Sequence, residues 1–322
     1  MDGASQMIIY SIPLLAISLL LIMLISDRII RYVLVISKAF GLSEMAAGFI
    51  LLSVTTSMPE LSVSIVASLA GEGGLSVGNV LGSNVANLTI ILGLAILFSR
   101  KDIMIKGQYQ KELVQFLFIS SVVPLFIVQR GSLGTMLGII LLILFGYFSV
   151  TISRKTETTT LDETPKHEGN IVAVCIKFFV GVILIIILST FAVGSSVDIA
   201  DFIGLPTSII GATIIGLGTS LPELATTIQA LKQGLFNMAL GSLLGSCITN
   251  ITLILGVSSL LSFSEVNVVA VQSIMFYVLL SSLSVWYMVG ASERLTKKGA
   301  IFLCLIYGIF ILQQVGVSVF IF

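Results

Sequence analysis

Two acidic residues offer the most informative chemistry in this sequence. The pattern Thr-Ser-x-Pro-Glu occurs twice, at residues 56–60 and 219–223, each time inside a long apolar run. All other acidic residues fall in loops, tails or the ends of apolar segments. A charge in the middle of a membrane-spanning helix costs at least roughly 2.5–3.5 kcal/mol, so Glu60 and Glu223 are expected to face the protein interior or water and to be functional. No Lys or Arg lies at a comparable depth, so a buried ion pair is the weaker explanation.

Oxygen-bearing side chains accompany each glutamate. Thr56 and Ser57 precede Glu60 by four and three residues, which places all three on one helical face. In the helix that follows, Ser83 and Asn87 likewise share a face. The second copy supplies Thr219, Ser220, Glu223, Ser246 and Asn250. Carboxylate, hydroxyl and amide oxygens without thiolate or imidazole suit hard cations such as calcium or sodium, so these residues form a candidate metal site.

The proline of each motif should add backbone oxygens to this set. Pro59 and Pro222 lack an N–H group and clash with the preceding turn, so they are expected to break or kink their helices. The break would free carbonyl groups near Thr55, Thr56, Gly218 and Thr219, which is tolerated at membrane depth where the carbonyls line a cavity. For Thr89 and Thr252, a hydrogen bond back to their own helix is the competing interpretation.

The composition indicates a helical membrane protein that positions these groups. Of 322 residues, 57% are hydrophobic and 10% charged, whereas a soluble domain carries about 25% charged residues. Apolar runs of about 20 residues recur and lack the alternation of barrel strands, so the fold class is all-α. The predicted spans are residues 7–26, 45–70, 76–98, 112–128, 133–153, 171–194, 204–231, 236–262, 266–289 and 299–321.

The two motifs belong to an internal duplication. Adding 163 to the residue number superposes residues 48–93 on 211–256 without a gap, and 18 of the 46 positions are identical, including polar residues and helix modifiers. The copies begin five predicted spans apart, so they enter the membrane from opposite sides. Inverted-topology repeats of this kind are typical of secondary transporters, whose sites lie near the bilayer midplane. We therefore expect two inverted five-helix repeats, 1–153 and 171–322, joined by a linker, 154–170.

Basic residues indicate the orientation of these spans. With the N-terminus outside, fourteen of the sixteen Lys and Arg residues fall in inner connections and only Arg130 in an outer one. Lys177, near the inner end of its span, can snorkel. The positive-inside rule then predicts a multi-pass protein of the cell membrane with both termini extracellular and the linker cytoplasmic. His167, in the linker, and the three cysteines, in apolar surroundings, carry no metal-site spacing.

The repeated TSxPEL and GSxxxN patterns resemble the two alpha repeats of the sodium/calcium exchangers, in the calcium/cation antiporter superfamily. The resemblance implies a calcium site formed by Glu60 and Glu223 with the carbonyls of Thr56 and Thr219. It implies sodium sites that use the same glutamates with Ser57, Ser83, Ser220, Ser246 and the carbonyls of Ser53 and Gly216. It further implies exchange of about three sodium ions for one calcium ion, with net charge movement that the membrane potential drives. Alternating access would come from sliding of segments 7–26 and 171–194 over the other spans.

Three departures from the family pattern bear on function. Asn250 stands where the potassium-dependent branch carries Asp, which argues against potassium co-transport and lowers the negative charge of the site. Ser53-Val54-Thr55 stands where a small residue and Gly are common, which weakens the expected carbonyl geometry on that side. The linker is too short for the large regulatory domain of animal exchangers.

Several alternatives stay open at this point. Proton/calcium exchangers of the same superfamily usually show GNxxE in place of TSMPE and TSLPE, so sodium is the favoured counter-ion, although the carboxylates could carry protons. A passive cation channel could use the same acidic lining, but an inverted repeat within one chain favours alternating access. An enzyme is not indicated, because HExxH and paired catalytic Asp residues do not occur. The expected partners are calcium, sodium and the lipid bilayer, with no cofactor, nucleic acid or obligatory protein partner.

Overall fold

The computed structural model describes residues 3–39, 56–99, 103–105, 108–155, 171–232, 236–262 and 264–316. Within these ranges, seven helices are long and apolar enough to cross a membrane, and three shorter apolar helices accompany them. The prediction of a helical membrane protein is therefore confirmed. Each of the ten predicted spans contains described helix, while the number of crossings stays a prediction.

The first half of the chain contains the longest helix and a short strand. It consists of α1 (Gly3–Ala39), α4 (Met58–Leu69), α5 (Gly73–Ala86), the π-helical segment η2 (Asn87–Ile91), α6 (Leu92–Phe98), β1 (Ile103–Met104), α7 (Gln108–Val122), α8 (Leu125–Arg130) and α9 (Thr135–Lys155). Helix α9 continues through the first two residues of the predicted linker 154–170, and residues 156–170 lie outside the described ranges.

The second half contains three further π-helical segments. It consists of α10 (Ile171–Ile203), α11 (Thr207–Ile210), η3 (Gly211–Ile215), α12 (Gly216–Thr219), α13 (Leu221–Lys232), α14 (Phe236–Thr249), η4 (Asn250–Ile254), α15 (Leu255–Leu261), α16 (Val268–Trp286), η5 (Tyr287–Ala291), β2 (Arg294–Leu295) and α17 (Lys297–Gln314).

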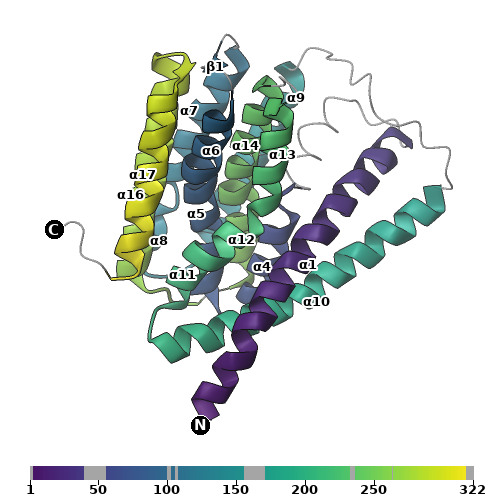
Figure 1. Ribbon diagram of the computed structural model, residues 1–322, viewed down its shortest axis with the longest axis vertical. Coiled ribbons are helices and arrows are strands. Elements are labelled where there is room, and N and C mark those ends of the chain that lie inside the picture. Colours follow the sequence, from purple (N-terminus) through teal and green to yellow (C-terminus); the bar gives the residue numbers. More distant parts are fainter. Residues whose placement is uncertain are drawn as a thin grey trace.

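Helices α1 and α10 are longer than the predicted spans 7–26 and 171–194. They contain 37 and 33 residues, or roughly 50–55 Å at 1.5 Å per residue. Hydropathy marks only the part of a helix that lies in hydrocarbon, whereas backbone hydrogen bonding continues the helix beyond it. Both helices lie side by side and tilted along one side of the bundle (Figure 1).

The duplication recurs in the backbone. Helices α4, α5 and α6 and the π-helical segment η2 begin and end 163 residues before α13, α14, α15 and η4. The interruptions before α4 and α13 also match, since Ser57 has φ −87° and ψ 15° and Ser220 has φ −87° and ψ 5°. The repeat therefore reproduces local irregularities as well as regular helix.

Repeated threonines lie within the π-helical segments. The Thr89 hydroxyl donates to the Val85 carbonyl, and the Thr252 hydroxyl donates to the Ile248 carbonyl at 2.6 Å. Each bond occupies the carbonyl four residues back, which competes with the regular helical ladder and favours local widening or bending. Back-bonding of these two threonines is thereby confirmed.

Burial separates a central core from peripheral helices. In the most apolar 18-residue stretches of Gly73–Phe98 and Ala239–Leu261, 83% of the residues are buried. In the corresponding stretches of α1 and α10, only 28% and 17% of the residues are buried. Large hydrophobic side chains on α1 and α10, such as Ile17 and Ile183, are exposed. In a membrane protein such a surface faces lipid, so α1 and α10 lie at the periphery and α5 and α14 at the centre.

Glycines let α5 approach the segment formed by α11, η3 and α12 at backbone distance. A Cβ atom at Gly82 would lie 2.2 Å from the Cα and O atoms of Ala212, and one at Gly211 would lie 2.5 Å from the Leu75 carbonyl oxygen. Gly78, one turn before Gly82, faces Ser208 in the same way. Small residues spaced four apart are the usual means of close helix contact in membranes. The contact joins the two halves of the chain.

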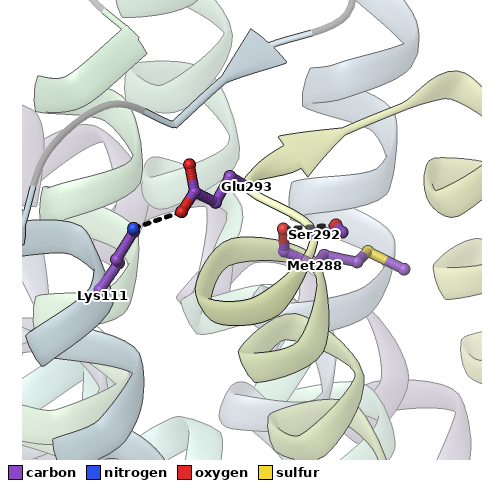
Figure 2. A network of polar contacts seen from close by, with 4 residues as sticks. All are labelled: Lys111, Met288, Ser292 and Glu293. Atoms are coloured by element: carbon purple, nitrogen blue, oxygen red, sulfur yellow. Dashed lines mark hydrogen bonds and ion pairs between the residues drawn. The ribbon is translucent and has the colours of Figure 1, made fainter.

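Short strands and an ion pair amend the all-α prediction at one end of the molecule. Strands β1 and β2 pair antiparallel, with Ile103 opposite Leu295 and Met104 opposite Arg294. Figure 2 shows the neighbouring contact, in which Lys111 Nζ lies 2.5 Å from Glu293 Oε1. A second, isolated bridge joins Ser132 to Glu265. The backbone N–H and C=O groups of these loops lie outside the helices, and pairing with another loop provides their hydrogen bonds.

Candidate functional site

Glu60 and Glu223 come from different repeats and lie in one buried cluster. Their side chains are 0% and 2% exposed. Each is in the first turn of its helix, α4 or α13, where the helix dipole favours negative charge. Glu60 Oε1 accepts a hydrogen bond from Ser220 Oγ at 3.1 Å, and the two carboxylates lie close enough for their charges to interact. The fold thus concentrates two negative charges at the junction of the repeats.

Hydroxyl groups connect the repeats in reciprocal pairs. Thr56 Oγ1 lies 2.9 Å from Ser246 Oγ, and Thr219 Oγ1 lies 3.4 Å from Ser83 Oγ. Residues 56 and 219, and residues 83 and 246, are equivalent in the duplication. In a two-fold interface, each contact between one residue of the first unit and another of the second is repeated with the two units exchanged. The two halves of the chain therefore contact each other reciprocally at this cluster.

Asn79 holds Glu60 in place. Its Nδ2 donates to the Glu60 carbonyl at 3.1 Å and to Ser64 Oγ at 2.9 Å, and its Oδ1 accepts from Thr219 Oγ1 at 3.3 Å. Asn79 does not stand out in the sequence, because its equivalent in the second repeat is Ser242. Its position one turn before Ser83 was the available signal, since residues four apart share a helix face.

Asn87 and Asn250 begin the equivalent π-helical segments η2 and η4 and are fully buried. Asn250 Nδ2 donates to Asn84 Oδ1 at 3.1 Å, and Asn84 Nδ2 donates to the Cys247 carbonyl at 2.9 Å. Asn84 does not stand out in the sequence either, because its equivalent is Cys247. Local departures from α-helical geometry are frequent at functional sites.

The remaining predicted residues fall in or next to the same cluster, except for two that lie outside the described ranges. The Gly216 carbonyl accepts from Ser83 Oγ at 3.1 Å. Pro59 and Pro222 each follow a helix interruption by two residues, at Ser57 and Ser220. Ser53 and Thr55 lie outside the described residues.

The cluster is rich in oxygen and poor in compensating charge. None of the described Lys or Arg side chains is buried, so the ion-pair explanation of the glutamates finds no partner in the part of the chain that the structure describes. Glu60 Oε2 and Ser57 Oγ are buried without a hydrogen-bond partner among the described residues. Buried polar atoms without a partner are costly. A hard cation with oxygen ligands would satisfy both the charge and the unpaired atoms.

Comparison with known proteins assigns the family. The model of the sodium/calcium exchanger protein family matches residues 10–154 and 174–316. The chain belongs to the sodium/calcium exchanger family. This family lies within the calcium/cation antiporter superfamily, as the motif resemblance implied.

Curated relatives align along most of the chain. Inner membrane protein YrbG of Escherichia coli (strain K12) is 32% identical over 270 residues, which cover 80% of this chain and 82% of the relative. Sodium/calcium exchanger MaX1 of Methanosarcina acetivorans is 29% identical over 285 residues, which cover 75% and 81%.

Solved structures share the fold. The sodium-calcium exchanger NCX_Mj, soaked with 2.5 mM Na+ and 0.1 mM Sr2+, has a TM-score of 0.63 at 25% identity and covers 94% of this chain and 98% of that one. The H+/Ca2+ exchanger CAX has a TM-score of 0.76 at 16% identity, with 96% and 87% covered. Membership of the sodium/calcium exchanger family supports cation/calcium antiport by a membrane transporter, not an enzyme.

Proposed function

We propose that this chain is a secondary active antiporter that exchanges sodium ions for one calcium ion at a site built around Glu60 and Glu223. The observation that carries the proposal is the meeting of these two glutamates, one from each repeat, in a single buried cluster of oxygen ligands. Two carboxylates match one divalent cation in charge. The hydroxyls of Thr56, Ser57 and their equivalents are adaptable ligands that can also replace the hydration shell of sodium.

The proposed cation ligands are the residues of the sequence prediction. Calcium would be bound by Glu60 and Glu223 with the carbonyls of Thr56 and Thr219. Sodium would use the same carboxylates with the hydroxyl, amide and carbonyl oxygens of Ser57, Ser83, Ser220, Ser246, Asn87, Asn250, Ser53 and Gly216. Because both cations use the same glutamates, their binding is mutually exclusive, and exclusion is what couples the two fluxes.

The direction of exchange follows from charge. If about three sodium ions enter for each calcium ion that leaves, one net positive charge moves inward, and each charge crossing 100 mV contributes about 2.3 kcal/mol. The membrane potential would then add to the sodium gradient in driving calcium export.

We further propose that the repeats, 1–153 and 171–322, insert with opposite topology, with both termini outside and the linker 154–170 inside. The reciprocal contacts of Thr56 with Ser246 and of Ser83 with Thr219 support a two-fold relation between the halves. Cysteines placed at Gln129 and Ser292, which are both exposed, would test the orientation. An impermeant thiol reagent added to intact cells should label the first, and labelling only the second would reverse the topology.

Alternating access is proposed to arise from movement of α1 and α10 across the central helices. Their low burial and their contact along each other support this division, because a weakly embedded pair can slide without disrupting the core. Ion access would then switch from one side of the cluster to the other.

Calcium uptake into vesicles containing the purified protein tests the proposal. Sodium-loaded vesicles diluted into sodium-free buffer should take up calcium. Because one net positive charge then leaves with sodium, an inside-positive potential should accelerate the uptake and an inside-negative one should slow it. Vesicles loaded with potassium or choline provide the control. Equal uptake without any counter-ion gradient would contradict exchange.

Proton/calcium exchange is the second candidate. The pair of buried carboxylates favours it as a proton carrier, and the fold likeness to the H+/Ca2+ exchanger CAX is consistent with it. In the same vesicles, an acidic interior without sodium should then drive calcium uptake. Uptake driven by sodium at equal pH would exclude this candidate.

A further inference from the structure

Two asparagines form a buried chain of hydrogen bonds between the repeats. Asn250 Nδ2 donates to Asn84 Oδ1 at 3.1 Å, and Asn84 Nδ2 donates to the Cys247 carbonyl oxygen at 2.9 Å. All three residues are fully buried. A carbonyl can only accept, so the Asn84 amide must direct its NH2 group to Cys247 and its oxygen to Asn250. The orientation of Asn84 is therefore determined by its surroundings.

This arrangement in turn orients Asn250. Its NH2 group is bound by Asn84, so its Oδ1 lies at the opposite end of the amide. Asn250 Oδ1 is buried and has no hydrogen-bond partner among the described residues. Asn250 follows Ser246 by one helical turn, and Ser246 contacts Thr56 of the first motif. The amide end that remains available next to the glutamate cluster is therefore the oxygen, which can bind a cation, and not the NH2 group, which would repel one.

We propose that Asn84 is a positioning residue for cation binding: it determines which end of the Asn250 amide faces the transported cation. This inference rests on the proposed function, because it assigns Asn250 to the cation site. Asn84 itself does not touch the cation. Its effect is carried through the Asn250 amide alone.

The chain has this device in one repeat only. The equivalent of Asn84 is Cys247, whose thiol is a weak donor and a weak acceptor. Asn87, the equivalent of Asn250, faces that thiol, and neither of its amide atoms has a conventional hydrogen-bond partner among the described residues. Asn87 therefore lacks the amide–amide hydrogen bond that orients Asn250. The two halves of the site are chemically unequal despite the two-fold arrangement.

Calcium binding to the purified full-length protein, measured by calorimetric titration in sodium-free detergent buffer, tests the inference. Asn84→Ala should weaken calcium binding by about tenfold, the lower end of the 10–100-fold loss when the partner that orients a metal ligand is removed. Ser76→Ala is the matched control. Ser76 is also buried on α5 and bonds across the repeats to Ser258 Oγ at 2.9 Å, away from the glutamates, so its loss should leave the calcium affinity within about twofold of wild type.

The Asn250→Asp background separates orientation from general packing. A carboxylate presents oxygen at both ends, so its binding to a cation does not depend on which end faces the site. In this background Asn84→Ala should change calcium affinity by less than about twofold, against about tenfold in the Asn250 protein. An equal loss in both backgrounds would show a merely structural role and overturn the inference.

Folding and function have separate readouts in this experiment. If Asn84→Ala does not elute as a monodisperse species, Asn84→Leu takes its place, because leucine removes the same hydrogen bonds while filling the space. The expected losses of calcium affinity in the Asn250 and Asn250→Asp backgrounds are the same. Unchanged calcium affinity of either variant in the Asn250 protein would overturn the inference and leave the proposed exchange intact. Absence of calcium binding to the wild-type protein would overturn both.

Discussion

Each of the two central carboxylates, Glu60 and Glu223, should be essential for calcium transport. Glu60→Gln and Glu223→Gln keep the shape of the side chain but remove one of two negative charges in a buried site. Breaking a buried pair of opposite charges, here a carboxylate and the bound cation, costs about 3–5 kcal/mol. That corresponds to roughly a hundredfold or more in cation affinity at 1.4 kcal/mol per tenfold. Each variant should therefore abolish sodium-driven calcium uptake in vesicles.

An exposed carboxylate provides the control for these two variants. Glu265 is exposed and takes part in a loop bridge to Ser132 through its backbone, so Glu265→Gln should transport calcium at the wild-type rate. Wild-type flux in either Glu60→Gln or Glu223→Gln would refute the proposed site.

The duplication explains which residues of the cluster could be found from sequence. Glu60, Thr56, Ser83 and their equivalents stand out because the same residue types recur 163 positions later. Asn79 and Asn84 do not recur, since their equivalents are Ser242 and Cys247. Their roles depend on contacts between helices of different repeats, and such pairings need the packed structure.

Contact between helices at backbone distance makes α5 intolerant of added atoms. A Cβ at Gly82 would lie 2.2 Å from the backbone of Ala212, which a side-chain rotation cannot relieve. Gly82→Ala should therefore destabilise the protein by about 3 kcal/mol, the upper end of the usual cost of overpacking, and lower its unfolding temperature by roughly 5–10 °C. Thermal unfolding of the detergent-solubilised protein, followed by size-exclusion chromatography, measures the effect.

Gly146→Ala is the matched comparison for Gly82→Ala. Gly146 lies in the interior of α9 with no described atom within 4 Å of the position of an added Cβ, and alanine is intrinsically the better helix former by up to about 1 kcal/mol. This variant should unfold at or slightly above the wild-type temperature. Equal stability of the Gly82 and Gly146 variants would contradict the close contact between α5 and η3.

Helical elements differ in how far the sequence predicts them. Apolar runs located every described span, because burial in lipid demands continuous hydrophobic helix. The runs did not locate the ends of α1 and α10, nor the π-helical segments η2 and η4. These features depend on backbone hydrogen bonding and on threonine back-bonds, to which hydropathy is insensitive.

At the scale of the whole molecule, the proposed two-fold relation between the halves links the site to the proposed mechanism. The glutamates, the reciprocal hydroxyl pairs and the matched helix interruptions all lie where the two repeats meet. In the proposed mechanism, rearrangement of the halves about this junction would change access from either side while the ligands stay together. Helices α1 and α10, which lie beside each other at the edge of the bundle (Figure 1), are equivalent in chain order in the two halves and are positioned to move as a pair.

Two engineered cross-links distinguish movement of this pair from movement within it. A Cβ at Gly218 of α12 would lie 2.8 Å from Leu19 Cδ1 of α1, and a Cβ at Gly181 of α10 would lie 3.1 Å from Ile29 Cγ1 of α1. In each pair the glycine directly faces the α1 side chain that a cysteine would replace, and oxidation forms the cross-link where the two Cβ atoms come within the about 3.5–4.5 Å that a disulfide requires. Leu19→Cys with Gly218→Cys would tie α1 to the core, whereas Ile29→Cys with Gly181→Cys would tie α1 to α10.

If α1 and α10 slide together over the core, oxidation should stop calcium exchange in the first double variant and leave it nearly unchanged in the second. Reduction with dithiothreitol should restore the first, because the block comes from the covalent tie and not from the substitutions. The four single-cysteine variants, oxidised in the same way, control for effects on the native thiols. Full exchange activity in the oxidised Leu19–Gly218 variant would mean that α1 does not move against α12, because a fixed distance between them would then be compatible with the complete transport cycle.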